Sequence, residues 1–221
     1  MNRTLNGWLA IIASSVAAGS FCWPLLAATL PNEAQSTTAA IAIGLLPVLA
    51  LFIVLLLDRE LASTKHIALL GVLAALGAAV RIATTGIGGV EAVFIVLILG
   101  GRAFGARFGF LLGMLTIAVS SLVWGGVGPW TAFQMFAAGW VGAGAGLLPR
   151  NSESSLNRAE RRREIGILIA YGVGASYLFG ALMNLWFWPF GVGPQTDVSY
   201  LAGADVLTNL ARFSTYTLLT S

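Results

Sequence analysis

Long runs of apolar residues, each followed by a short polar or glycine-rich stretch, make up most of this chain. The runs cover about residues 7–30, 36–57, 67–84, 91–102, 107–124, 130–148, 165–188 and 205–221. A helix needs about 20 predominantly apolar residues to cross the hydrocarbon core of a bilayer. The pattern therefore predicts an all-α fold, a polytopic bundle of transmembrane helices, in which the run 91–102 is shorter than a full span.

The composition favours lipid as the surrounding medium. Hydrophobic residues make up 57% of the 221 residues and charged residues only 10%, whereas a soluble domain averages about 25% charged residues. The N-terminal apolar run lacks a clean small-residue cleavage site, so we expect a retained first helix rather than a signal peptide.

Basic residues mark one side of the predicted bundle. Ten of the twelve Lys and Arg residues fall in alternate loops, and the opposite loops carry acidic residues instead. The positive-inside rule places the basic loops, including the N-terminus and the 149–164 segment, in the cytoplasm. We therefore expect a multi-pass protein of the plasma membrane with a cytoplasmic N-terminus.

Several kinds of chemistry are excluded by what the sequence lacks. It contains no phosphate-binding GxxxxGK[ST] loop, and its single Cys and single His cannot form a zinc cluster or a Cys–His dyad. All nine acidic residues fall in or next to loops, so an intramembrane carboxylate pair is also missing. We expect no enzyme, and neither a metal nor a cofactor.

Tryptophans and uncharged amides gather where the apolar runs meet the predicted outer loops. The candidates are Trp124, Trp130, Gln134, Asn184 and Trp188. Trp130 and Gln134 are four residues apart, as are Asn184 and Trp188, so each pair shares a helix face. Amides can orient a polar, ring-containing solute while indoles cover its faces. An interfacial aromatic belt combined with internal packing is the alternative that the sequence leaves open.

Two arginines lie inside apolar runs, where a charge costs at least ~2.5 kcal/mol at the bilayer centre. Arg81 lies near the predicted outer end of its helix, so it could pair with an anionic group of a solute or extend to the interface. For Arg212 the second interpretation is favoured.

Small residues recur at helical spacing in the segment GVLAALGAAV, residues 71–80. They are Gly71, Ala74, Ala75, Ala78 and Ala79. A face of small side chains lets two membrane helices approach closely. Internal packing and docking of another membrane protein both remain open for this strip, whereas internal packing is favoured for the second small pair, Gly142 and Gly146.

Four segments together resemble a known family. They are GVLAALGAAVRI, EAVFIVLILGGRAFGARFGFLLGML, GGVGPWTAFQMFAAGWVGAGAGLLP and MNLWFWPF, between about residues 67 and 190. They are similar to the substrate-binding membrane subunit (S component) of energy-coupling factor (ECF) type ABC vitamin transporters. The resemblance is to a sub-type associated with actinobacterial genomes, which carries two extra N-terminal helices.

The resemblance implies a vitamin-binding helix bundle that has no ATPase activity of its own. S components bind a vitamin or precursor at the outer face and deliver it inward with a transmembrane coupling protein and two cytoplasmic ATPases. The family's AxxxA motif, which touches the coupling protein, falls here on Ala74 and Ala78, with Ala75 and Ala79 adjacent. On this basis Arg81 and the five rim residues above are expected to line the site, and a corrinoid-like solute such as cobalamin is the suggested ligand.

The resemblance also suggests a domain division. We expect two N-terminal transmembrane helices in residues 1–60 and an S-component-like bundle in 61–221, whose final helix stops incomplete. Two other functional classes remain as alternatives. One is a self-sufficient secondary transporter or channel, which would need an ion-coordinating intramembrane cluster, and the other is a membrane scaffold that binds no solute.

Overall fold

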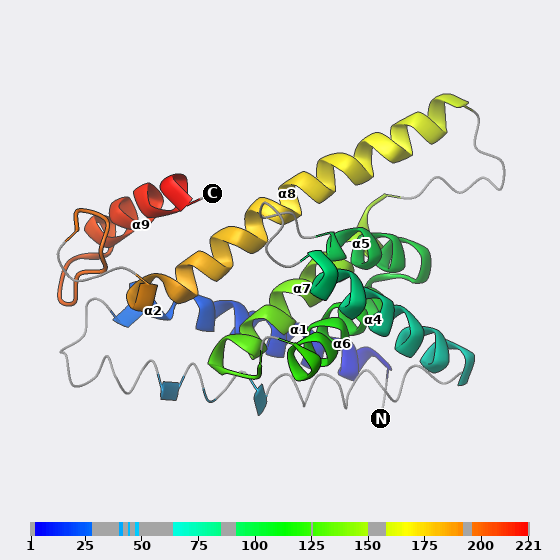
Figure 1. Cartoon of the computed structure of the whole chain (residues 1–221), viewed down its shortest axis with the longest axis horizontal. Coiled ribbons are helices and arrows are strands. Elements are labelled where there is room, and N and C mark those ends of the chain that lie inside the picture. Colours follow the sequence, from blue (N-terminus) through cyan, green and yellow to red (C-terminus); the bar gives the residue numbers. More distant parts are fainter. Residues whose placement is uncertain are drawn as a thin grey trace. The chain divides into compact units, whose positions relative to one another are not determined.

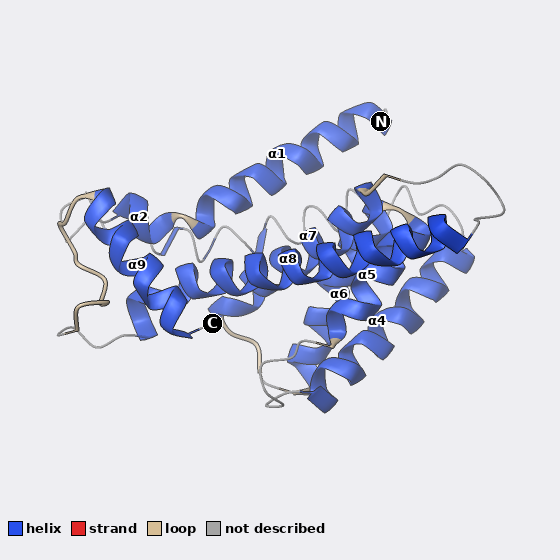
Figure 2. Ribbon diagram, turned by 90° about the horizontal axis from the view of Figure 1, so that it is seen from above, coloured by secondary structure: helices blue, strands red, loops and turns tan. Residues whose placement is uncertain are grey.

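The computed structural model consists of helices joined by turns and loops. It describes residues 3–27, 40–41, 44, 47–48, 64–84, 92–124, 126–149, 158–191 and 196–220. Figure 2 shows helices and no strand in this part of the chain. The expected all-α class is therefore confirmed.

The helices follow the apolar runs closely. In chain order they are α1 (Arg3–Phe21), α2 (Trp23–Ala27), α4 (Thr64–Thr84), α5 (Val93–Phe104), α6 (Ala106–Val123), α7 (Pro129–Leu147), α8 (Arg158–Gly191) and α9 (Val206–Thr220) (Figure 1). The predicted run 36–57 lies almost entirely outside the described residues. The short run 91–102 forms a helix of 12 residues, α5.

Two helices differ from their predicted extent. The first run, expected to be one helix, breaks at Cys22 into α1 and α2. Helix α8 begins seven residues earlier than the apolar run, because the arginine-rich segment continues the helix. Its 34 residues rise about 51 Å, which exceeds the hydrocarbon core of about 30 Å, so its charged first turns can extend into water.

Three helices within the described residues are long and apolar enough to cross a membrane, judged by length and composition. They are Thr64–Thr84, Ala106–Val123 and Arg158–Phe190. Apolar side chains such as Val72, Leu76 and Ile169 are exposed on these helices. An exposed apolar surface of this kind is what a lipid environment requires.

The chain divides into two compact units. Unit 1 comprises Met1–Glu60, Gly128–Phe133 and Gly180–Ser221, and unit 2 comprises Leu61–Val127 and Gln134–Phe179. In unit 2, α6 packs against both α4 and α5, and the three helices lie side by side in Figures 1 and 2. In unit 1, α2 packs against α1 and α9.

Glycines allow the helices of unit 2 to touch backbone to backbone. A methyl group added to Gly109 or Gly101 would overlap the carbonyl group of Gly142, and one added to Gly113 would overlap the carbonyl of Ala138. Gly146 approaches the backbone of Ala106 in the same way. The small pair Gly142 and Gly146 thus serves internal packing, as expected. Dispersion contacts at this short range hold membrane helices together where no hydrophobic driving force exists.

Candidate functional site

Arg81 is held by two polar side chains inside unit 2. Its Nη1 atom donates to the Ser120 hydroxyl oxygen at 2.9 Å, and its Nη2 atom donates to the Gln134 amide oxygen at 3.1 Å. Ser120 is fully buried in α6 and donates in turn to the carbonyl oxygen of Ile117 at 3.0 Å. Both acceptors are uncharged, so they fix the direction of the guanidinium group while preserving its positive charge.

The packing of α4 on α6 brings these groups together. Gly77 lies against Thr116, whose Oγ1 and Cγ2 atoms would be 2.9 Å from an added Cβ. One turn further along both helices, Arg81 reaches Ser120. Because residue numbers increase in the same direction on the two helices, α4 and α6 run parallel. The absence of a side chain at Gly77 permits the close approach that lets Arg81 reach α6.

The sequence identified Arg81 and Gln134 but not Ser120. A serine inside an apolar run commonly bonds to its own helix backbone, so the presence of a serine there does not by itself indicate a site. The signal that could have revealed Ser120 is its spacing of four residues from Thr116. That spacing places two hydroxyl groups on one face of an otherwise apolar helix.

Two of the predicted tryptophans lie at helix ends. Trp124 follows α6, is exposed, and donates its backbone N–H to the carbonyl of Ser120 at 2.8 Å. Trp130 is the second residue of α7 and is also exposed; its ring lies against Gly128, where a Cβ would collide with it. Trp124 belongs to unit 2 and Trp130 to unit 1.

Trp188 has a structural environment in unit 1. Its side chain is fully buried, and its indole N–H donates to the carbonyl of Val198 at 2.7 Å. The rings of Tyr200 and Phe213 lie 5.4 and 5.5 Å from it, measured between centroids. Trp188 therefore holds the segment after α8 against α8 and α9, and its indole N–H already donates a hydrogen bond within the protein. Asn184 lies half-buried one turn earlier in α8.

Side chains of α9 fasten the same segment. Asn209 is fully buried, and its amide exchanges two hydrogen bonds with the backbone of Leu201, at 3.0 and 2.9 Å. Arg212 donates to the carbonyl oxygens of Thr196 and Ser199, at 3.2 Å each. Arg212 thus has a local structural role. Sequence patterns did not indicate Asn209, because its hydrogen-bond partner is a backbone group.

The small strip of α4 is divided between two environments. Ala74 and Ala78 are only 2% and 3% exposed, so they lie inside unit 2. Ala75 and Ala79 are exposed, together with Gly71. The five residues therefore do not form one free face as the spacing suggested.

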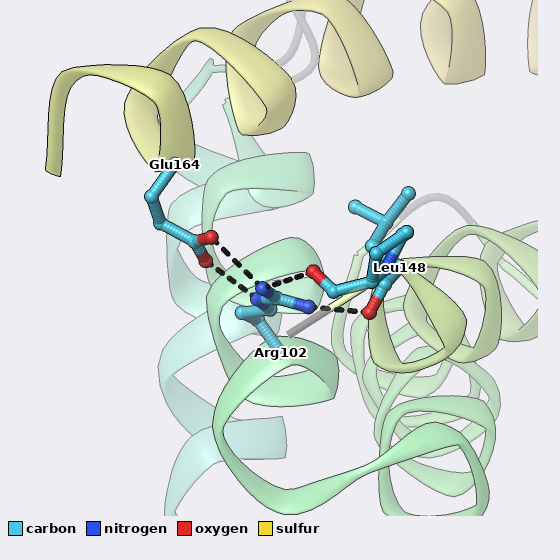
Figure 3. Close-up of polar contacts among 4 residues, drawn as sticks. Arg102, Leu148 and Glu164 are labelled. Atoms are coloured by element: carbon cyan, nitrogen blue, oxygen red, sulfur yellow. Dashed lines mark hydrogen bonds and ion pairs between the residues drawn. The ribbon is translucent and has the colours of Figure 1, made fainter. Parts of the chain in front are cut away.

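An arginine clamp lies at the end of unit 2 where the basic segment begins. Arg102 in α5 forms a two-pronged ion pair with Glu164 in α8, at 2.6 and 2.9 Å (Figure 3). The same guanidinium donates to the carbonyl oxygens of Leu148 and Pro149, at 2.6 and 2.8 Å. These carbonyls follow the last turn of α7, so one side chain joins three helices and neutralises a helix C-terminus.

A groove of about 310 Å³ separates α4 from α5. Its lining consists of apolar side chains and one glycine, among them Leu73, Leu76, Ile95 and Phe104. It offers nothing to orient a polar solute, so it suits a lipid chain or another apolar segment better than a vitamin. Among the residues that the structure describes, no group of three or more His, Cys, Asp or Glu side chains could hold a metal ion.

Comparison with known proteins gives one family. The family model described as "ECF-type riboflavin transporter, S component" matches residues 61–220. Searches of curated proteins and of solved structures find no match. The matched range contains Arg81, Ser120 and Gln134, whereas α1 and α2 precede it.

Proposed function

The chain belongs to the S-component family of ECF-type riboflavin transporters, and we propose that it captures a flavin-type vitamin at its outer face. As a member of this family it is a membrane-embedded, vitamin-binding subunit that works with an ECF module, and it is not an enzyme.

The arrangement of Arg81, Ser120 and Gln134 carries the proposal. Placing a guanidinium group within an apolar helix bundle costs free energy, and such a group normally interacts with a solute or a partner. Here two neutral acceptors hold Arg81 in one direction, which lowers the entropy that a ligand must remove on binding. Such a donor group suits the polar edge of a vitamin ring, where carbonyl oxygens and ring nitrogens accept hydrogen bonds.

Riboflavin is the first solute to test. The family name supports it, and its isoalloxazine ring combines a flat conjugated face with two carbonyl acceptors on one edge. The corrinoid suggested by the sequence resemblance is the second candidate, favoured by the number of tryptophans in the chain. The two differ in size and in edge chemistry, so direct binding measurements separate them.

The decisive experiment is binding by the full-length protein in lipid nanodiscs. We expect riboflavin fluorescence to be quenched on titration with the wild-type protein, and cobalamin not to compete. Arg81→Lys is expected to weaken binding by about tenfold, because an ammonium group cannot reproduce the fixed directions of a guanidinium group. Arg163→Lys, at an exposed position in the basic segment, is the matched control.

Three results would contradict this assignment. Tight cobalamin binding without riboflavin binding would establish the corrinoid alternative, and binding of neither, with no vitamin found by mass spectrometry of the purified protein, would favour the scaffold. Uptake of a solute by the chain alone in proteoliposomes would instead establish a secondary transporter.

The orientation is proposed from the distribution of basic residues. Ten of twelve fall on the side that includes Arg158–Arg163, so we place that segment and the N-terminus in the cytoplasm. A Cys22→Ala background carrying Arg161→Cys tests this with a membrane-impermeant thiol reagent on intact cells. We expect labelling only after the cells are opened, and labelling of intact cells would reverse the orientation.

A further inference from the structure

The apolar groove between α4 and α5 is open to the surroundings of unit 2. Its volume of about 310 Å³ lies at the lower end of the range of about 300–1,000 Å³ that ligand pockets occupy. Three of its lining side chains, Leu76, Ile95 and Leu99, are 51%, 63% and 53% exposed. All of its lining residues belong to unit 2, so the groove is complete within one unit.

Helix α6 closes the groove from behind. Gly100 lines the groove but is itself buried, and a Cβ added to it would overlap the side chain of Leu112 in α6. The exposed side chains of the lining stand on the opposite side. The groove therefore opens away from the protein, toward the lipid that surrounds a membrane helix.

One face of α4 carries both a wall of the groove and a lysine. Leu76 lines the groove, and Lys65 precedes it by 11 residues, which is about three turns of helix. The two side chains leave the helix in directions about 20° apart, and Lys65 is exposed. The rise between them is about 16.5 Å, close to the half-thickness of about 15 Å of a bilayer core. An acyl chain along the groove therefore has its headgroup at the level of Lys65.

A second cation, Arg107, lies at the same end. Gly77 of α4 lies against Thr116 of α6 and the two helices run parallel, so their starts are at the same level. Arg107 is the second residue of α6 and is exposed, and the α5 wall of the groove ends at Phe104, three residues earlier. Helices α4, α5 and α6 contain no acidic residue. This end of the groove is therefore positively charged.

We propose that the groove binds one anionic phospholipid, with an acyl chain between α4 and α5 and the phosphate group at Lys65 and Arg107. The lining is apolar, which suits an acyl chain better than a polar solute. The two cations attract an anionic headgroup to the end of the groove. This site is additional to vitamin binding and does not depend on it.

Native mass spectrometry of the full-length protein tests the charged end. The protein is reconstituted in nanodiscs of equimolar phosphatidylglycerol and phosphatidylcholine, extracted into detergent, and analysed for retained phospholipid. We expect the wild-type protein to retain phosphatidylglycerol in preference, and Lys65→Gln to reduce that preference by about fivefold, the effect of one basic residue at an anionic surface. Arg158→Gln is the matched control, because it removes a charge at an exposed position of α8 and leaves the groove unchanged.

A second variant tests the groove itself. Ala103 lines the groove and is exposed, so Ala103→Phe fills the space of the acyl chain while the cations remain. We expect the retained amount of both lipids to fall by about tenfold, because the filled groove no longer admits the chain. Ala170→Phe is the control, since Ala170 is exposed on α8 and does not line the groove.

Photocrosslinking of the wild-type protein covers the case in which a variant folds poorly. Phosphatidylglycerol with a diazirine on its acyl chain is incorporated into the nanodiscs, and the labelled peptides are mapped by mass spectrometry. We expect adducts concentrated on Leu76, Ile95 and Leu99. Adducts spread evenly over exposed apolar residues, with Ile169 of α8 labelled as strongly, would show surrounding lipid only and overturn the proposal.

The lipid measurements can contradict the proposal in two further ways. Wild-type protein that retains no phospholipid would leave the groove to a protein segment. Retained phosphatidylglycerol that is unaffected by both Lys65→Gln and Ala103→Phe would place the lipid elsewhere on the protein.

Discussion

Ser120 orients the side chain of Arg81, the residue that we propose binds the vitamin. It is buried in α6, bonds to its own helix backbone, and still accepts from Arg81 at 2.9 Å. A long, flexible arginine side chain loses considerable rotamer entropy when it is fixed. Ser120 and Gln134 fix the Arg81 side chain within the protein, so a ligand at the proposed site would not have to do so.

The role of Ser120 can be tested without touching Arg81. Ser120→Ala is expected to weaken riboflavin binding by about fivefold, because the hydrogen bond that orients the guanidinium group is lost. Ser121→Ala is the matched control, since Ser121 is also buried in α6 but points about 100° away around the helix. Titration by flavin fluorescence checks both variants, and equal affinities would leave Ser120 with a packing role only.

At the scale of helices, backbone contact between glycines determines the spacing within unit 2. Gly142 of α7 meets Gly109 of α6 and Gly101 of α5 at one point. Each of the three positions is too crowded for even a methyl group. The repeated glycines in this part of the sequence are therefore required by close packing, which lipid-embedded helices use in place of hydrophobic burial.

Gly142→Ala should show the importance of this contact. We expect the free energy of unfolding to fall by about 1–3 kcal/mol, because the added methyl group must push two helices apart. Gly174→Ala in α8 is the control; nothing lies within 4 Å of its added Cβ, so it should be neutral or slightly stabilising. Thermal unfolding in detergent micelles measures the stability of both variants. Equal transition temperatures would show that the helices move apart at little cost in free energy.

The start of α9 depends on one carboxylate. The backbone N–H of Thr208 donates to Asp205 at 2.6 Å and its hydroxyl donates at 3.0 Å. These bonds, the backbone one foremost, hold the pKa of Asp205 below its ordinary value. A lowered pKa means that the cap stabilises α9 fully above the ordinary pKa, and that this stabilisation is lost as the pH falls through the pKa of the folded state.

The pH dependence can be assigned to this residue by comparison with Asp205→Asn. In the wild-type protein, amide hydrogen exchange in the first turn of α9 should accelerate, relative to the rest of the helix, once the pH falls below about 4. The Asp205→Asn variant keeps a capping side chain but cannot titrate, so its relative protection should stay constant over this range. Parallel pH profiles for the two proteins would show that another group is responsible.

For the whole molecule, the central question is how a subunit without its own ATPase is coupled to the ECF module. The exposed side of α4 carries small residues, Ala75 and Ala79, whereas Ala74 and Ala78 are used inside unit 2. The two halves of the strip therefore have separable roles. We propose that the exposed pair accepts a helix of the coupling protein, whereas the buried pair packs within unit 2.

Leucine substitutions distinguish these roles. Ala75→Leu and Ala79→Leu should lower riboflavin uptake by cells at least tenfold while leaving binding by the purified protein unchanged, because a bulky side chain blocks helix approach from outside. Ala74→Leu and Ala78→Leu should lower the thermal stability of the protein itself. Uptake assays and thermal unfolding test the two pairs, and normal uptake by both outer variants would place docking elsewhere.

The sequence by itself determined the described helices with their approximate ends, the membrane setting and the family. These properties depend on residues close together in the chain, since apolar periodicity and transfer into lipid are nearly local and additive. Local patterns did not predict two helix boundaries. One is the break at Cys22 between α1 and α2, and the other is the start of α8 within the arginine-rich segment.

Only the tertiary structure decided which polar groups meet. Arg81 finds Ser120 and Gln134 at separations of 39 and 53 residues, and the choice depends on how closely α4 approaches α6. The same packing decided which alanines of the strip are buried. In unit 1 the packing decided that the indole N–H of Trp188 has a hydrogen-bond acceptor, whereas that of Trp186 has none among the described residues. Identical residue types acquire different roles because the partner of a buried donor is set by neighbouring helices and not by its own helix.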